Sequence, residues 1–224
     1  PQVIHDFSGY ISTMIKPRVA KKFIASDQEG SIQTHARFKN IVEQMHIRKG
    51  TWLILGRTQE LVRELEGLAR LHGLFFQNTK GKHSFDLNKW NAIQYWKRLK
   101  EGGHVKKEEA GIIYTYINEI AYGWRSIESK RWKNLGDDKQ YSLDFLRTSG
   151  GLLASPYTWQ QVFNRNFSES DKQYFEQIIE KNIDLSLASN VIIDTIHSIK
   201  GGEAQHVCVY EKANWPAHFE NKVG

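Results

Sequence analysis

Residues 194–203 carry the densest group of side chains that could do chemistry. The segment, Asp-Thr-Ile-His-Ser-Ile-Lys-Gly-Gly-Glu, combines hydroxyls, a histidine, a lysine, two glycines and a terminal carboxylate. Hydroxyls, lysine and glycine amides are suited to holding phosphate oxygens. Apolar runs flank the segment, so we expect it at the carboxyl end of a parallel strand, where such sheets place ligands. A tight polar turn without a ligand is the alternative interpretation.

This segment resembles motif V of superfamily 1 helicases of the UvrD/Rep type, in which Thr-x-His-Ser-x-Lys-Gly-x-Glu follows a strand. The matching residues are Thr195, His197, Ser198, Lys200, Gly201 and Glu203. The chain departs from the bacterial repair enzymes at Gly202 and Ala204, where those usually carry larger apolar residues. Its Lys-Gly-Gly-Glu-Ala form is similar to versions found in phage-type helicases.

A second resemblance lies upstream. Residues 53–58, followed by a leucine-striped helix and by residues 73–76, resemble the motif IVa region of the same family. There a strand ends in Arg-Ser/Thr, and a helix and a further strand follow. Gln59 stands where many relatives carry Asn. A helix is predicted at residues 2–16, and this segment is similar to the one that follows the family's Ser-Tyr-Arg-x-Pro motif.

The resemblance implies an α/β fold with a RecA-like parallel sheet, flanked by helices and interrupted by a mostly helical insertion. Residues 1–79 would form the first part of the motor's second RecA-like domain, and residues 188–224 its second part. Residues 80–187 would form a helical inserted subdomain, similar in position to the family's 2B subdomain.

The same resemblance implies roles for individual residues. Those expected to bind nucleotide are Lys200, Gly201 and Glu203. Those expected to contact DNA are Thr195, His197, Ser198, Arg57 and Thr58. ATP and Mg²⁺ would be the cofactors of the complete protein. Single-stranded DNA and the N-terminal RecA-like domain of the same protein would be the partners.

Several parts of a complete motor are not found in the sequence. It has no P-loop, no strand ending in the paired acids that hold Mg²⁺, and no motif VI arginine before Gly224. We therefore expect no catalytic residue in this chain and no ATP hydrolysis by it alone, whereas the parent protein would be an ATP-driven translocase.

Two alternatives remain open. The first is a non-catalytic module, derived from a helicase domain, that binds nucleic acid or a protein partner. A reading frame upstream of Pro1 that encodes a P-loop would favour the motor instead. The second, half of a nuclease-linked helicase, would require downstream acids that this chain does not contain.

The elements that position these residues follow from the hydrophobic pattern. Apolar runs too short for helices predict buried parallel strands at residues 52–55, 74–76, 191–193 and 207–210. Thr58 should cap the helix after the first run, and Gly73 should end it. Helices are also predicted at residues 2–16, 37–45, 87–100, 107–124, 157–163 and 169–183, with a strand at 31–35 and a loop at 128–140. Aromatic residues of the predicted insertion would more often fill a core than stack on bases: Trp90, Trp96, Tyr114, Trp124 and Trp132.

Composition favours an anionic partner. The net charge of +6 and the pI near 9.3 suit nucleic acid, although a mildly basic surface alone gives the same values. The apolar runs are far shorter than the roughly 20 residues of a membrane span, and no signal peptide is recognisable. Cys208, the single cysteine, is expected to be buried and inert, which suits a reducing compartment. The resemblance to UvrD/Rep-type helicases implies the cytoplasm of a bacterial or phage-infected cell. No metal-ligand spacing is found.

Overall fold

The computed structural model describes residues 2–14, 16, 24, 29–121, 124–128, 131–153, 158–183, 185 and 189–211. The chain divides into two compact units, Pro1–Gln44 and Met45–Gly224. No helix in the described part of the chain is long and apolar enough to cross a membrane.

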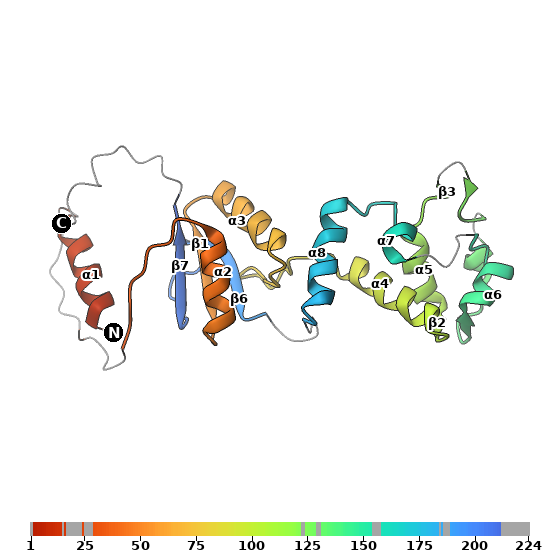
Figure 1. The fold of residues 1–224 in the computed structure, drawn as a ribbon, viewed down its shortest axis with the longest axis horizontal. Coiled ribbons are helices and arrows are strands. Elements are labelled where there is room, and N and C mark those ends of the chain that lie inside the picture. The colour runs from red at the N-terminus through yellow and green to blue at the C-terminus, as the bar shows by residue number, and fades with distance from the viewer. Residues whose placement is uncertain are drawn as a thin grey trace. The chain divides into compact units, whose positions relative to one another are not determined.

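The first unit contains helix α1 (Gln2–Thr13) and most of α2 (Phe38–Ile47) (Figure 1). Both helices are confirmed close to their predicted bounds, although Pro17, the predicted end of the first, lies outside the described residues. None of the residues of α1 is buried, so its apolar stripe is exposed. The strand predicted at residues 31–35 is wrong: this segment is irregular. Alternation of apolar and polar residues does not produce a strand unless a neighbouring strand accepts its hydrogen bonds.

A three-stranded parallel sheet with the order β6-β1-β7 lies at the centre of the α/β part of the second unit. Strand β1 (Trp52–Gly56) lies between β6 (Val191–Thr195) and β7 (His206–Tyr210). Every residue of β1 is buried, as its unbroken apolar run predicts. The parallel sheet expected from the sequence is therefore confirmed.

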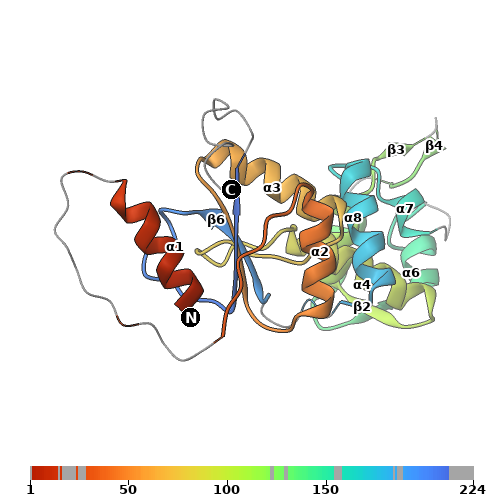
Figure 2. The ribbon, with the colours of Figure 1, turned by 60° about the vertical axis from the view of Figure 1, so that its left-hand side comes forward.

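Helix α3 (Gln59–Leu71) packs against β1 and β6 (Figure 2). As predicted, it begins after Thr58, whose side-chain oxygen accepts a hydrogen bond from the Leu61 N–H at 3.3 Å. Gly73 follows its end at a φ of +61°, a conformation that costs glycine little. The buried residues of the helix are Val62, Leu65 and Ala69.

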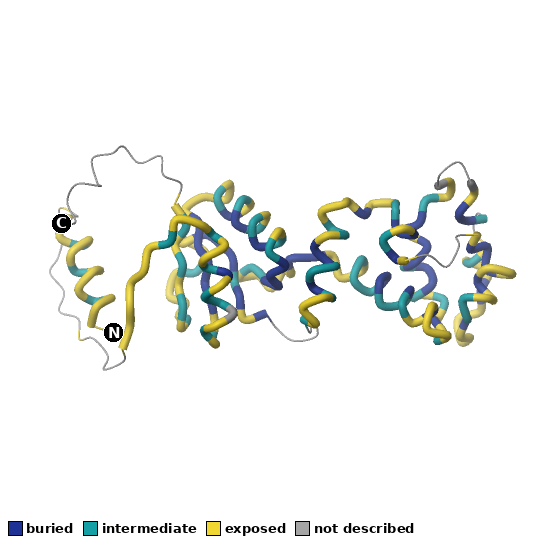
Figure 3. The backbone as a smooth tube through the Cα atoms, viewed as in Figure 1, coloured by how far each residue is buried: buried dark blue, intermediate teal, exposed yellow. Residues whose placement is uncertain are grey.

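Strand β7 is less buried than its sequence predicts. Its residues alternate between partly buried and exposed (Figure 3). Val207 and Val209 are 56% and 53% exposed. Cys208 faces the other way and is partly buried, which raises the pKa of its thiol. The prediction of a strand is confirmed and that of a fully buried strand is wrong, because a run of apolar residues does not reveal whether both faces are covered.

A hairpin over residues 76–84 continues the sheet beyond β6. The N–H of Gln77 donates to the Val191 carbonyl at 3.0 Å, and the Ile193 N–H donates to the Gln77 carbonyl at 3.0 Å. Gln77 also forms an antiparallel bridge with His83, which closes the hairpin. The strand predicted at residues 74–76 is wrong: these residues are buried but irregular, and a single parallel bridge to β6 forms one residue later, at Gln77.

The helical region comprises the elements from α4 to α8. They are α4 (Leu87–Lys100), β2 (His104–Lys106), α5 (Lys107–Thr115), β3 (Ile120–Ala121), β4 (Trp124–Arg125), the 3-10 helix η1 (Arg131–Asn134), β5 (Gln140–Ser142), α6 (Leu143–Thr148), α7 (Trp159–Val162) and α8 (Glu169–Glu180). The helix predicted over residues 107–124 is wrong beyond Thr115, where a short antiparallel pair, β3 with β4, follows. A second antiparallel pair joins β2 to β5. The region is thus mainly helical with two small β pairs.

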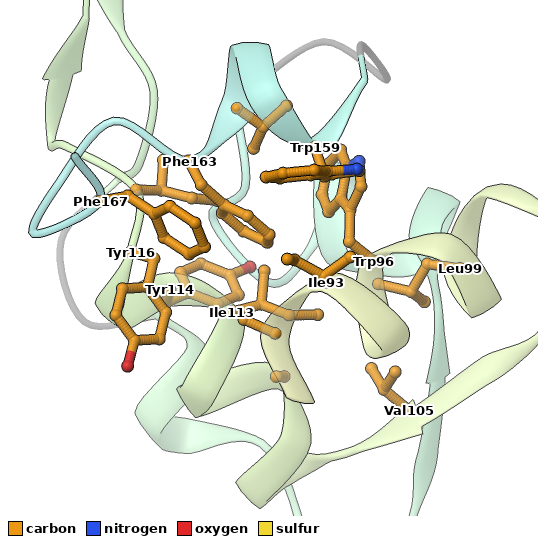
Figure 4. Packing of buried hydrophobic residues seen from close by; sticks show 14 of the residues in the cluster. Ile93, Trp96, Leu99, Val105, Ile113, Tyr114, Tyr116, Trp159, Phe163 and Phe167 are labelled. Carbon is orange, nitrogen blue, oxygen red and sulfur yellow. The ribbon is translucent and has the colours of Figure 1, made fainter. Parts of the chain in front are cut away.

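Aromatic rings fill the core of this region (Figure 4). Trp96 and Phe163 are fully buried and meet edge to face, with ring centroids 6.1 Å apart. Tyr114 is also buried, and its hydroxyl donates to the Gly150 carbonyl at 2.8 Å. Trp96 and Tyr114 are therefore core residues rather than an exposed stacking surface, whereas the side chain of Trp124 lies outside the described residues.

Candidate functional site

Three strands end together at one edge of the sheet, here called the carboxyl edge. In register, Gly56 of β1 lies between Thr195 of β6 and Tyr210 of β7. The backbone N–H of Ile196 donates to the Gly56 carbonyl at 3.1 Å. The sequence predicted two separate site segments, one beginning at Arg57 and the other at Thr195. In the structure these segments are neighbours.

A tight turn over residues 195–198 opens the loop after β6. The Ser198 N–H donates to Thr195 Oγ1 at 3.1 Å, and the two hydroxyl oxygens lie 2.7 Å apart. Thr195 is buried, whereas Ser198 is exposed. Thr195 therefore builds the turn, and Ser198 lies on the surface that the turn forms.

The next predicted site residues are all exposed. The side chains of His197, Lys200 and Glu203 form no hydrogen bond or ion pair with any residue in the described part of the chain. Gly201 has a φ of +84°, and a Cβ built there meets nothing within 4 Å. The loop thus exposes the imidazole of His197, the ammonium of Lys200, the carboxylate of Glu203 and the backbone at Gly201.

The side chains of Arg57 and Thr58 have different interactions in the structure. Arg57 is exposed, and its guanidinium forms no ion pair with another described residue. The side-chain oxygen of Thr58 accepts the capping hydrogen bond of α3. Thr58 therefore has a structural role whether or not it also meets a ligand.

Asp194 is a site residue that the sequence analysis missed. Its Oδ2 accepts hydrogen bonds from the Thr79 N–H at 3.1 Å and from Thr79 Oγ1 at 2.5 Å, and its Oδ1 accepts from the Thr195 N–H at 2.7 Å. Burial alone would raise the pKa of this carboxyl, but these hydrogen bonds outweigh burial and lower it. The ionised carboxylate fixes the tip of the 76–84 hairpin to the end of β6. An aspartate inside an apolar strand was the signal in the sequence.

A hollow of about 580 Å³ lies between this hairpin and α3. The ionisable groups along it are Glu66, Arg70, Lys82, His83 and Asp86. Burial raises the pKa of Glu66, and nearby Lys82 opposes that rise. With acids and bases in similar number, the hollow itself has no strong preference for one sign of charge.

The described residues contain no group of three or more His, Cys, Asp or Glu side chains that could hold a metal ion. No protein-family model matches the chain, and neither a curated protein nor a solved structure matches it. The carboxyl edge and the two segments that form it are therefore the candidate functional site. Chemically, this edge can hold phosphate oxygens through cations, hydroxyls and open backbone.

Proposed function

We propose that this chain is the second RecA-like domain of an ATP-dependent DNA helicase of superfamily 1. In this proposal the carboxyl edge contacts single-stranded DNA and closes over ATP held mainly by the N-terminal RecA-like domain of the same protein. The observation that carries the proposal is the junction of the two motif-like segments at one sheet edge, where Ile196 is hydrogen bonded to Gly56.

The exposed cations of this edge suit a nucleic-acid backbone. Arg57 can give two parallel hydrogen bonds to a phosphate, and His197 and Ser198 can add donors from the neighbouring turn. Because these groups form no ion pair among the described residues, a ligand would not have to displace an acid. We assign the DNA backbone to Arg57, Thr58 and the turn over residues 195–198.

The later part of the loop suits a nucleotide. Lys200 and the open backbone at Gly201 can face phosphate oxygens, and Glu203 can accept hydrogen bonds from a sugar or from water bound to a phosphate. By the motif resemblance we assign these three residues to the ATP side of the cleft. Bound ATP with Mg²⁺ would supply the free energy for movement, and this chain's residues would hold one side of it.

One short loop would thus serve both ligands. The Lys200 N–H donates to the His197 carbonyl at 3.3 Å, so the two halves of the loop are joined by a backbone hydrogen bond. A shift of the nucleotide half would therefore reach the DNA half directly. This is how we propose that opening and closing of the cleft moves the domain along the strand.

ATP hydrolysis by the full-length gene product, with and without single-stranded DNA, tests the proposal. We expect DNA-stimulated turnover that collapses in Glu203→Ala. The matched control is Glu101→Ala, an exposed acid of the helical region, which should retain turnover. Absence of DNA-stimulated turnover in the wild type would refute the motor, and DNA binding without turnover would indicate a non-catalytic binding module.

A further inference from the structure

We infer that the tip of the 76–84 hairpin, residues 78–82, is an additional binding surface for the phosphodiester backbone of single-stranded DNA. The inference rests on the proposed function and extends its site by Lys80 and Lys82. Neither lysine belongs to the motifs that the chain resembles. The inference rests on their position, on the rigidity of the tip and on the finding that neither lysine forms an ion pair with another described residue.

The hairpin tip lies at the carboxyl edge. Gln77 pairs in parallel with β6, so the residues after Gln77 leave the sheet at the same edge as those after Thr195. The bonds from Thr79 to Asp194 hold the tip against the end of β6. Across the edge the order is therefore hairpin tip, loop after β6, loop after β1, with neighbouring strands ~4.8 Å apart.

The backbone of the tip is held rigidly. Asn78 Oδ1 accepts hydrogen bonds from the Lys80 N–H at 3.0 Å and from the Lys82 N–H at 2.9 Å. The Asn78 N–H donates to the Lys82 carbonyl at 3.0 Å, and Gly81 turns the chain at a φ of +76°. A preorganised tip loses little conformational entropy when its side chains bind a ligand.

The two ammonium groups are available. Lys80 and Lys82 are exposed, and neither forms an ion pair with a residue in the described ranges. Three lysines of the helical region differ: Lys89, Lys107 and Lys172 each lie within 2.8 Å of a carboxylate oxygen. Unpaired cations release counterions when they neutralise phosphates, which is the main source of affinity for a nucleic-acid backbone.

Two acids lie near the tip lysines. The Asp194 carboxylate accepts three hydrogen bonds from Thr79 and Thr195, so it is already satisfied. Glu66 lies by Lys82 in the adjacent hollow, where burial raises its pKa and the charge of Lys82 opposes that rise. Together with Arg57 and Lys200, the tip lysines extend the row of cations along the carboxyl edge.

Binding of a fluorescent oligothymidylate to the full-length protein, measured by anisotropy over a range of NaCl concentrations, tests this inference. We expect Lys80→Ala/Lys82→Ala to weaken binding at least tenfold. Losing two phosphate contacts should also reduce the slope of log K against log salt by about 1.4, since each contact contributes about 0.7 on single strands. Lys80→Arg/Lys82→Arg keeps both charges and should retain affinity.

Two further variants separate this inference from the proposed function. Lys100→Ala/Lys139→Ala removes the same charge from exposed positions of the helical region and should leave binding unchanged. His197→Ala should weaken binding through the motif-like loop. If His197→Ala weakens binding but the tip variant behaves like the charge-matched control, the hairpin inference is wrong and the proposed function stands. If the wild type does not bind the oligothymidylate, both are wrong.

Discussion

The helical region and the sheet use their side chains in different ways. In the helical region large aromatic side chains are fully buried, among them Trp96, Phe163 and Phe175. In the sheet every residue of β1 is buried, whereas one face of β7 is exposed. Several cations of the helical region are paired with acids, as in Lys107 with Asp137 at 2.6 Å. Those of the carboxyl edge form no ion pair among the described residues.

We expect this difference to separate the residues that stabilise the fold from those of the proposed binding edge. Groups that are paired or buried contribute to the folded state and have little left to offer a ligand. Exposed, unpaired cations on a fixed sheet edge contribute little to folding and much to ligand binding. Variants in the two regions should therefore separate into those that change stability and those that change affinity.

The largest loss of stability is expected from Trp96→Ala. Trp96 is fully buried among aromatic rings, so its removal creates a cavity that costs about 3–5 kcal/mol. Urea unfolding followed by far-ultraviolet circular dichroism measures the loss. Trp132→Ala, at a half-buried tryptophan stacked on Tyr114, is the control and should cost less. Equal losses would contradict the central place given to Trp96.

Asp171→Asn should cost about 2 kcal/mol, less than a fully buried ion pair because the site is partly solvated. Asp171 lies 2.7 Å from both Arg70 of α3 and Lys89 of α4, and its side chain is 16% exposed. It therefore joins the sheet to the helical region. Glu169→Gln, at an 80% exposed acid, should change stability by less than about 0.5 kcal/mol.

The contribution of Asp171 should also depend on pH. Burial raises its pKa, but hydrogen bonds from Lys89 and Ser168 outweigh burial and lower it. The folded pKa thus lies below the unfolded value of about 3.9, so the contribution is present above that pH and is lost as pH falls through the folded pKa. The difference in unfolding free energy between wild type and Asp171→Asn should shrink at acid pH. A difference that is constant with pH would contradict the ionic role.

Thr58→Ala should cost about 1 kcal/mol, because α3 loses the side-chain cap that the Leu61 N–H uses. Thr58→Ser keeps a capping oxygen and should restore stability. Thermal unfolding measures both variants, and anisotropy with single-stranded DNA measures affinity alongside. Should Thr58→Ala leave stability unchanged but abolish binding, the residue would belong only to the DNA surface.

The smallest effect is expected from Val207→Ser. Val207 is 56% exposed on β7, so a polar side chain there should change stability by less than about 0.5 kcal/mol. Ile54→Val in β1 removes one buried methyl group and should cost about 0.5–1.5 kcal/mol in the same assay. A loss from Val207→Ser above that of Ile54→Val would indicate that another part of the protein covers this face.

Local patterns predicted much of the fold. The apolar runs of β1 and β6 and the bounds of α4 follow from residues that are close in sequence. The end of α5 does not follow from the local sequence. Beyond Thr115, the Tyr116 carbonyl accepts hydrogen bonds from the Asn164 N–H at 3.1 Å and the Arg165 N–H at 3.0 Å. These distant partners end a helix that the apolar pattern alone would continue.

The candidate site was predictable to a similar degree. Parallel neighbouring strands end at the same edge of a sheet, so the topology alone brings Arg57 close to Thr195. The contact between Thr79 and Asp194 joins positions 115 residues apart, and no local pattern encodes it. Exposure of β7 was missed for the same reason, since it depends on what the rest of the chain covers. The RecA-like assignment and the roles of Thr195, His197, Lys200 and Glu203 stay predictions.

The 76–84 hairpin is held at both ends, and this makes it a mechanical link. At its base, the Tyr174 hydroxyl of α8 donates to the Leu74 carbonyl and lies beside Ser84 Oγ, both at 2.7 Å. At its tip, Thr79 is fixed to Asp194. Burial raises the pKa of Tyr174 to about 12, so this phenol keeps its proton over the whole physiological range. A displacement of α8 must therefore either break the hydrogen bonds of Tyr174 or move the hairpin relative to the end of β6.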